Sequence, residues 1–220
     1  MKRKIASVIC IVSLFLFIIT FSIGLPIYAR PFYFAHITPL GLVESSGVSR
    51  EEIVTAYNEI LDYLTLPGRS FSTGVFQHSA SGALHFSDCK RLFTLNATLL
   101  LTSACILLAL FVLRRRSKLP PLRLGRFSAG FYAGVASILI PLLITGAASI
   151  NFQKAFLLFH RVFFPGRFNF YFDPRIDGII TVLPMQFFMN CAILIGASVL
   201  IFSLILIFVD LRRIKKENTK

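Results

Sequence analysis

Four stretches of this 220-residue sequence are apolar, carry no charge in their interiors and are long enough to cross a lipid bilayer. A helix needs roughly 20 predominantly apolar residues to cross a hydrocarbon core of about 30 Å. The stretches are residues 5–28, 93–113, 127–154 (apolar through residue 150) and 178–209. Hydrophobic residues make up 55 % of the chain and its mean hydropathy is +0.75, so the sequence predicts an all-α integral membrane protein with four transmembrane helices.

The first stretch follows three basic residues, as the apolar core of a signal peptide does. It is too long for such a core, however, and Ile27 stands where a signal peptidase needs a small residue. We therefore expect residues 1–28 to remain as a transmembrane helix.

Lysine and arginine are distributed unevenly between the connecting segments. If the N-terminus is cytoplasmic, 14 of the 23 basic residues lie on the cytoplasmic side, together with two acidic residues. The other nine lie outside among eight acidic residues. Because an excess of basic residues marks the cytoplasmic side, we expect both termini of a multi-pass plasma-membrane protein to be cytoplasmic. The formal net charge of +13 is then a signal of topology and does not indicate nucleic-acid binding.

The connecting segments differ in character. In the longest, Ser49 and Glu52 have the spacing of a helix capping box, and apolar residues follow at helical intervals until Pro67-Gly68. This segment predicts a small extracellular helical cap. The expected order is a transmembrane helix over residues 1–28, the cap over 29–92, a transmembrane helix over 93–113, a cytoplasmic loop over 114–126, a transmembrane helix over 127–150, an extracellular interfacial aromatic segment over 151–178, a transmembrane helix over 179–209 and a cytoplasmic tail over 210–220.

Several standard catalytic and nucleotide-binding motifs are missing from the sequence. It has no Walker A motif, no G-x-G-x-x-G, no G-x-S-x-G and no H-E-x-x-H, so we expect no nucleotide and no cofactor. No ionisable residue lies inside an apolar stretch, which disfavours a proton or ion pathway at the bilayer midplane. Any chemistry belongs at the outer rim, where all four histidines are expected: His36, His78, His85 and His160.

His85 precedes Asp88 by one helical turn. A carboxylate at this spacing could orient the imidazole, or the two could join His160, Asp173 and Asp177 around a metal ion. An ordinary helix-surface pair has the same spacing. The spacing alone leaves these three interpretations open.

Short sequence blocks occur in a distinctive order near the predicted outer rim. They are Leu84-His-Phe-Ser-Asp88 with Lys90-Arg-Leu-Phe93, Phe159-His-Arg-Val-Phe-Phe-Pro-Gly166, Phe172-Asp-Pro174, Asp177-Gly-Ile-Ile180, and Leu183-Pro184 with Phe187-Phe188. Together they resemble the lipoprotein intramolecular transacylase family, Lit, of low-GC Gram-positive bacteria. The family usually has a tryptophan near Phe170 and an acidic residue near Met185, whereas this chain has no tryptophan.

The resemblance implies a membrane acyltransferase that moves the sn-2 acyl chain of a diacylglyceryl lipoprotein to the α-amino group of its N-terminal cysteine. An ester becomes an amide, so no energy source is required. His85 and His160 would be the catalytic acid–base pair, with Asp88, Arg161, Tyr171 and Asp173 supporting them or the oxyanion. Acyl chains would lie against Phe156, Phe163, Phe164, Phe168 and Phe170. No metal is implied, and the expected partners are the lipoprotein substrate and membrane lipid.

Two other classes of protein remain open at the level of sequence. A non-enzymatic membrane accessory protein would use the cap as a docking surface and would not depend on either histidine. A metal-dependent membrane hydrolase would use His85, Asp88, His160 and Asp173 as ligands and would be sensitive to chelators.

Overall fold

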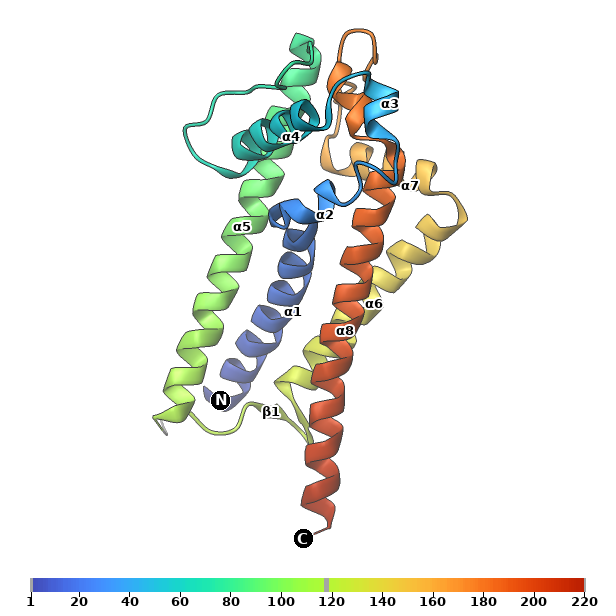
Figure 1. Ribbon diagram of the computed structural model, residues 1–220. Helices are drawn as coiled ribbons and strands as arrows, with labels where there is room; N and C mark the ends of the chain where they lie inside the picture. Colours follow the sequence, from blue (N-terminus) through green and yellow to red (C-terminus); the bar gives the residue numbers. More distant parts are fainter. Residues whose placement is uncertain (1, 117–118, 220) are drawn as a thin grey trace. The chain divides into compact units, whose positions relative to one another are not determined.

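The computed structural model describes the backbone of residues 2–116 and 119–219, and the side chains of residues 4–116, 119–139 and 151–219. The helices α1 to α8 and the strand β1 are labelled in Figure 1. In chain order the elements are α1 (Lys2–Tyr28), α2 (Arg30–Phe34), α3 (Leu42–Ser46), α4 (Arg50–Thr65), α5 (Ala80–Arg115), β1 (Arg123–Leu124), β2 (Phe127–Ser128), α6 (Ala129–Ile150), α7 (Phe152–Phe163), the 3-10 helix η1 (Gly178–Val182) and α8 (Met185–Asn218).

Among the described residues, three helices are long and apolar enough to cross a membrane: α1, α5 and α8. At 36 residues α5 is about 54 Å long, well beyond a hydrocarbon core of about 30 Å. Its first turns therefore extend past the predicted span at residues 93–113. The third predicted span coincides with α6, whose first part, Ala129–Leu139, is a shorter apolar helix. The side chains of its second part, residues 140–150, lie outside the described residues.

The last long helix begins later than its uncharged stretch. Residues 178–182 form the 3-10 helix η1, and α8 starts at Met185. Leu183, with φ of −123°, precedes Pro184, which has no N–H and disfavours a helical conformation in the residue before it. The Leu183-Pro184 pair thus separates η1 from α8 and sets the start of α8.

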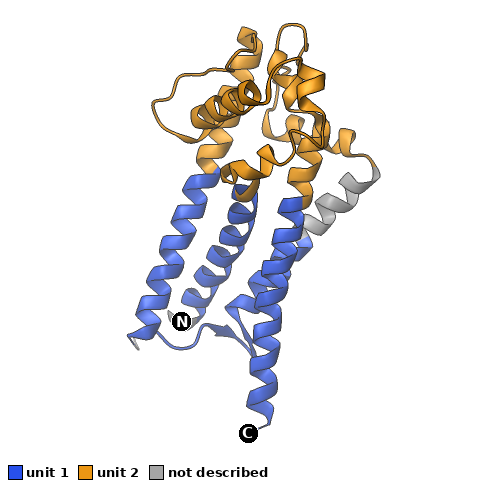
Figure 2. Cartoon of the chain, in the orientation of Figure 1, with its two compact units in different colours: residues 1–24, 96–146, 194–220 blue, residues 25–95, 147–193 orange. Residues whose placement is uncertain are grey.

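The chain forms two compact units, coloured separately in Figure 2. Unit 1 comprises residues 1–24, 96–146 and 194–220, and unit 2 comprises residues 25–95 and 147–193. In unit 1, the buried carboxylate of Asp210 accepts hydrogen bonds from the Ser128 N–H (3.1 Å) and from Arg213 Nε (2.9 Å). Arg213 also donates to the Arg126 carbonyl (2.8 Å), so this cluster ties the β1–β2 hairpin to α8.

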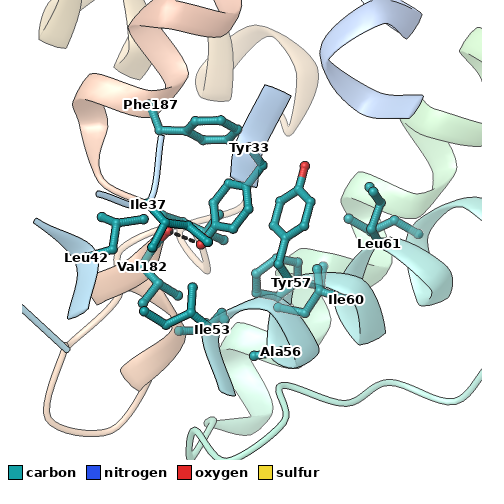
Figure 3. Packing of buried hydrophobic residues seen from close by; sticks show 14 residues of the cluster. Tyr33, Ile37, Leu42, Ile53, Ala56, Tyr57, Ile60, Leu61, Val182 and Phe187 are labelled. Atoms are coloured by element: carbon teal, nitrogen blue, oxygen red, sulfur yellow. Dashed lines mark hydrogen bonds between the residues drawn. The ribbon is translucent and has the colours of Figure 1, made fainter. Parts of the chain in front are cut away.

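Unit 2 has a continuous hydrophobic core. Tyr33 and Tyr57 stack with ring centroids 3.6 Å apart, and the Tyr33 hydroxyl donates to the Val182 carbonyl at 2.8 Å (Figure 3). Around them pack residues from α2, α4, η1 and the start of α8, including Ile53 and Phe187. The predicted cap residues therefore share one core with the segment that follows α7.

Helix α4 forms as its sequence predicts. The Ser49 hydroxyl accepts from the Glu52 N–H at 3.3 Å, and the Glu52 carboxylate accepts from the Ser49 N–H at 2.8 Å, which completes the capping box. Two orphan donors of the first turn are thus satisfied. The apolar face of α4 then enters the core of unit 2 through Ile53, Ala56, Tyr57, Ile60, Leu61 and Leu64.

Candidate active site

Helix α5 presents His85 from its second turn, and the start of this helix is fixed by a buried carboxylate. Asp177 accepts hydrogen bonds from the Ser79 N–H (2.7 Å) and the Ser79 hydroxyl (3.0 Å). The Ser79 oxygen in turn accepts from the Gly82 N–H at 2.8 Å, as a helix N-cap does. The segment before α8 is thereby joined to the turn that precedes His85.

His85 and His160 lie side by side although 75 positions separate them in the sequence. Their ring centroids are 5.5 Å apart and their planes differ by 28°. Each is only 6 % exposed. Of the four histidines predicted at one rim, the structure brings these two together: His36 bonds through Nδ1 to the Phe32 carbonyl, and His78 lies beside Thr73.

Both imidazoles are neutral near pH 7. Burial lowers the pKa of His160, against a smaller effect of its hydrogen bond to the Phe156 carbonyl. Burial also lowers the pKa of His85, as does the neighbouring His160, while Asn169 and Asp88 act in the opposite direction. His85 lies outside the predicted membrane span, because it precedes Phe93, where that span begins, by about two turns of α5. A neutral imidazole can accept a proton, so each ring is a candidate base.

The hydrogen-bond partners indicate which nitrogen carries the proton in His160. Its Nδ1 lies 2.8 Å from the Phe156 carbonyl oxygen, which can only accept, so Nδ1 must donate. This leaves the Nε2 lone pair of His160 free. The Nε2 atom of His85 lies 3.4 Å from the Cys89 sulfur, one helical turn further along α5.

Aromatic rings enclose the histidine pair. Phe164 packs against both imidazoles at centroid distances of 5.1 Å and 5.6 Å, and Phe170 lies 4.7 Å from His160. Phe156 lies 4.3 Å from His160, and Phe172 lies 5.5 Å from His85. This apolar enclosure is the physical cause of the lowered pKa values, because it removes water from both rings.

Asp88 is buried and acts on a different partner from the one expected. Its Oδ2 accepts a hydrogen bond from Asn169 Nδ2 at 3.0 Å and lies 3.8 Å from Arg167 Nε. Its Oδ1 lies 4.0 Å from Arg91. Within the described side chains no hydrogen bond joins Asp88 to His85, so any influence on the imidazole passes through Asn169 or through space.

The remaining predicted site residues lie toward the surface. Asp173 pairs with the exposed Arg175 at 2.7 Å, and Tyr171 is exposed but packs its ring on Phe170 at 4.4 Å. Arg161 is exposed on α7 beside His160. Among the predicted acyl-binding residues, Phe164 and Phe170 are buried, Phe156 is partly buried, and Phe163 and Phe168 are 51 % and 76 % exposed.

Sequence reasoning missed three residues at this site. Cys89 could have been found, because it lies four residues after His85 and therefore on the same face of a helix. Phe172 stands in one of the blocks that resemble the transacylase family, but no contact with a histidine was predicted for it. Asn169 had no signal in the sequence, since its partner Asp88 is 81 positions away.

The described residues contain no group of three or more His, Cys, Asp or Glu side chains placed to hold a metal ion. In particular, Asp173 is engaged by Arg175 and Asp88 by Asn169. The four ligands of the hydrolase interpretation are therefore not gathered around a common point.

The fold is that of an all-α membrane protein, and its buried pair of neutral imidazoles is a site suited to acid–base chemistry. A protein-family model described as "Lipoprotein intramolecular transacylase Lit" matches residues 8–188. The chain belongs to this family, and it is accordingly an integral, multi-pass membrane transacylase whose substrate class is lipoprotein.

Solved structures support the same fold. The membrane-integral lipoprotein intramolecular transacylase Lit from Bacillus cereus superposes with a TM-score of 0.86 at 22 % identity, over 100 % of this chain and 99 % of that one. The same protein with an H85R mutation gives a TM-score of 0.79 at 21 % identity, over 99 % and 94 %. With an H85A mutation it gives 0.79 at 21 %, over 100 % and 96 %. A comparison with curated protein sequences gave no match.

Proposed function

We propose that this chain moves the sn-2 acyl chain of a diacylglyceryl lipoprotein to the α-amino group of the same lipoprotein's N-terminal cysteine, giving the lyso form. The observation that carries the proposal is the pair of buried, neutral imidazoles of His85 and His160, 5.5 Å apart within an aromatic enclosure. Membership of the transacylase family supplies the reaction class.

The proposed topology has four transmembrane helices, both termini in the cytoplasm and the active site at the outer leaflet. Residues 29–92 form the extracellular cap, and residues 151–178 form the interfacial aromatic segment. Support comes from the 14 basic residues that gather on the cytoplasmic side of this arrangement and the nine that lie outside. The two histidines then lie where the lipid-anchored N-terminus of an exported lipoprotein is found.

The chemistry needs one base and one acid. The α-amino group has a pKa of about 8 and is mostly protonated at neutral pH, so it must lose a proton before it can attack the ester carbonyl. A carbon–nitrogen bond forms, the ester carbon–oxygen bond breaks, and the departing glyceryl oxygen takes up a proton. In becoming an amide, the protonated amine gives up two protons: one is released to water and the other ends on the glyceryl hydroxyl. His85 and His160 share these transfers.

Positioning makes a second contribution. The amine and the ester belong to one molecule, and their reaction closes a medium-sized ring, which is entropically unfavourable. An enclosure that holds both groups together supplies up to several kcal/mol, on the order seen for oriented intramolecular reactions. Phe164 and Phe170 form the inner wall beside the imidazoles, while the exposed Phe163 and Phe168 are placed to contact lipid and the outer parts of acyl chains.

The tetrahedral intermediate carries negative charge on its carbonyl oxygen. Arg161 and Tyr171 are the side chains we propose to stabilise it, alone or with backbone N–H groups. Both side chains are exposed, and each adjoins a buried ring of the site. Arg161 follows His160 in the sequence, and Tyr171 packs on Phe170. Asp173 forms an ion pair with Arg175 in the same segment. Its proposed role is to support the site from the outer side.

The direct test is mass spectrometry of lipoprotein N-termini in a bacterial host that makes no lyso form. Expression of this chain should convert diacylglyceryl N-termini into N-acyl, lyso-glyceryl N-termini of unchanged total mass. A substrate labelled only in its sn-2 chain should carry the label on the amine. If the label remained on glycerol, or if the total mass fell by one acyl chain, the protein would be an accessory protein or a hydrolase.

A further inference from the structure

Two buried polar atoms at the histidine pair have no hydrogen-bond partner among the described residues. They are Nδ1 of His85 and Oδ1 of Asn169. The other three such atoms are serine hydroxyls, those of Ser22, Ser137 and Ser203. Buried polar groups are nearly always paired, so an imidazole nitrogen and an amide oxygen left without partners at one site require an explanation.

The orientation of the Asn169 amide follows from its other partner. Asn169 Nδ2 donates to Asp88 Oδ2 at 3.0 Å, and an ionised carboxylate can only accept. The amide nitrogen must therefore face Asp88, and the amide oxygen is left as a free acceptor. Arg167 Nε and Arg91 flank the Asp88 carboxylate at 3.8 Å and 4.0 Å and help to hold it in place.

His85 is the group on which this free oxygen acts. The Asn169 side chain raises the pKa of His85 against the larger opposing effect of burial, so the two side chains are neighbours although their geometry falls short of a hydrogen bond. The second ring nitrogen, Nε2, is already occupied at 3.4 Å by the Cys89 sulfur. Nδ1 is thus the ring atom that lacks a partner, and Asn169 Oδ1 is the acceptor that lacks a donor.

We propose that Asn169 is a positioning residue whose amide, oriented by Asp88, accepts the Nδ1–H of His85 and so holds its Nε2 lone pair ready to accept a proton. This inference rests on the proposed transacylation and adds a residue to its machinery. Asp88 then acts on His85 through Asn169. Cys89 supplies only a weak S–H donor to Nε2, which the substrate ammonium can displace.

An amide suits this position better than a carboxylate. A carboxylate at Nδ1 would favour the imidazolium and leave less neutral base at pH 7. An amide fixes the tautomer and the ring plane without adding a charge. Asn169 then stands between the negative charge of Asp88 and the imidazole. The role of Asp88 is to determine which end of the Asn169 amide faces His85.

The test combines two variants with a readout that needs no activity. In Asn169→Ala the acceptor is lost, and in Asp88→Asn the reason for the amide's orientation is lost. Each should lower kcat by about 10–100-fold with KM little changed, the loss typical of residues that orient a functional imidazole. Because both act through one chain of contacts, the double variant should lose no more than the worse single variant. Asn190→Ala removes a partly buried amide that is bonded to Gln186 on α8; it is the matched control and should leave kcat unchanged.

The tautomer of His85 is read directly by ¹⁵N NMR of histidine-labelled protein in detergent, with the signal assigned by its loss in His85→Gln. Wild type should show His85 protonated at Nδ1, and Asn169→Ala should show a shift toward the Nε2–H form. Wild-type His85 protonated at Nε2, or an unchanged tautomer in Asn169→Ala, would overturn the proposal. If the tautomer shifts as expected while wild type makes no lyso-lipoprotein, the positioning role stands and the proposed function fails.

Discussion

A single methyl group added at Gly82 should damage the site more than its size suggests. A Cβ at this position would overlap the Asp177 carboxylate Oδ1 and would come within 3.1 Å of the Phe172 ring. Asp177 must then move away from Ser79, which loses the hydrogen bonds at 2.7 Å and 3.0 Å that fix the start of α5. Phe172 also packs on His85, so the base would shift with it.

The expected size follows from these contacts. Two hydrogen bonds to a charged acceptor contribute about 1.5–3 kcal/mol each, and replacing a helical glycine by alanine returns about 1 kcal/mol. Gly82→Ala should therefore lower the free energy of unfolding by about 2–5 kcal/mol, which corresponds to a fall in Tm of roughly 4–20 °C for a chain of this size. Activity should fall as well, because the turn before His85 is displaced.

Gly196→Ala on α8 is the matched control, since a Cβ at that position would meet no other atom within 4 Å. It should keep or slightly raise Tm and leave activity unchanged. Thermal unfolding in detergent and lyso-lipoprotein formation measure both effects. Combining Gly82→Ala with Asp177→Ala removes the main clash, so the two losses should be less than additive. A Gly82→Ala protein with wild-type Tm and activity would refute this view of how α5 is anchored.

Two further predictions concern pH and topology. Burial lowers the pKa of both His85 and His160 below the ordinary 6.5, so the unfolded chain binds more protons as pH falls below that value. Stability should therefore be fully present above about pH 6.5 and fall below it, and His85→Gln with His160→Gln should flatten this dependence; an equally steep fall in the double variant would show that other groups cause it. For topology, a membrane-impermeant thiol reagent should label Glu51→Cys in intact cells and Thr219→Cys only after permeabilisation, and the reverse pattern would invert the proposed orientation.

Local signals in the sequence predicted part of this fold well. The spacing of Ser49 and Glu52 identified the start of α4, and both capping-box hydrogen bonds are present. Uncharged apolar runs likewise identified α1, α5 and α8 as helices able to cross a membrane. These features depend on residues within one or two turns of each other, so a single sequence carries the whole signal.

Other features depend on tertiary contacts and were not predictable. Helix α7 was expected only as an aromatic interfacial segment, although the Asn151 side chain caps it by accepting from the Lys154 N–H. The start of α8 at Met185 depends on Pro184 and on the packing of η1 in the core of unit 2. The histidine pair was inferred from family resemblance, and no spacing rule joins positions 85 and 160.

The proposed catalysis depends most on the two histidines, and one measurement tests their role directly. Mass spectrometry should quantify lyso-lipoprotein made by His85→Ala, His160→Ala, His36→Ala and His78→Ala, each shown by immunoblot to be present in the membrane. Removing either member of an acid–base pair costs about 10²–10⁴ in rate, so the first two variants should make almost no product. His36 and His78 contact other groups, the Phe32 carbonyl and the Thr73 hydroxyl, so their variants should keep most activity. Near-native product from both His85→Ala and His160→Ala would contradict the proposed mechanism.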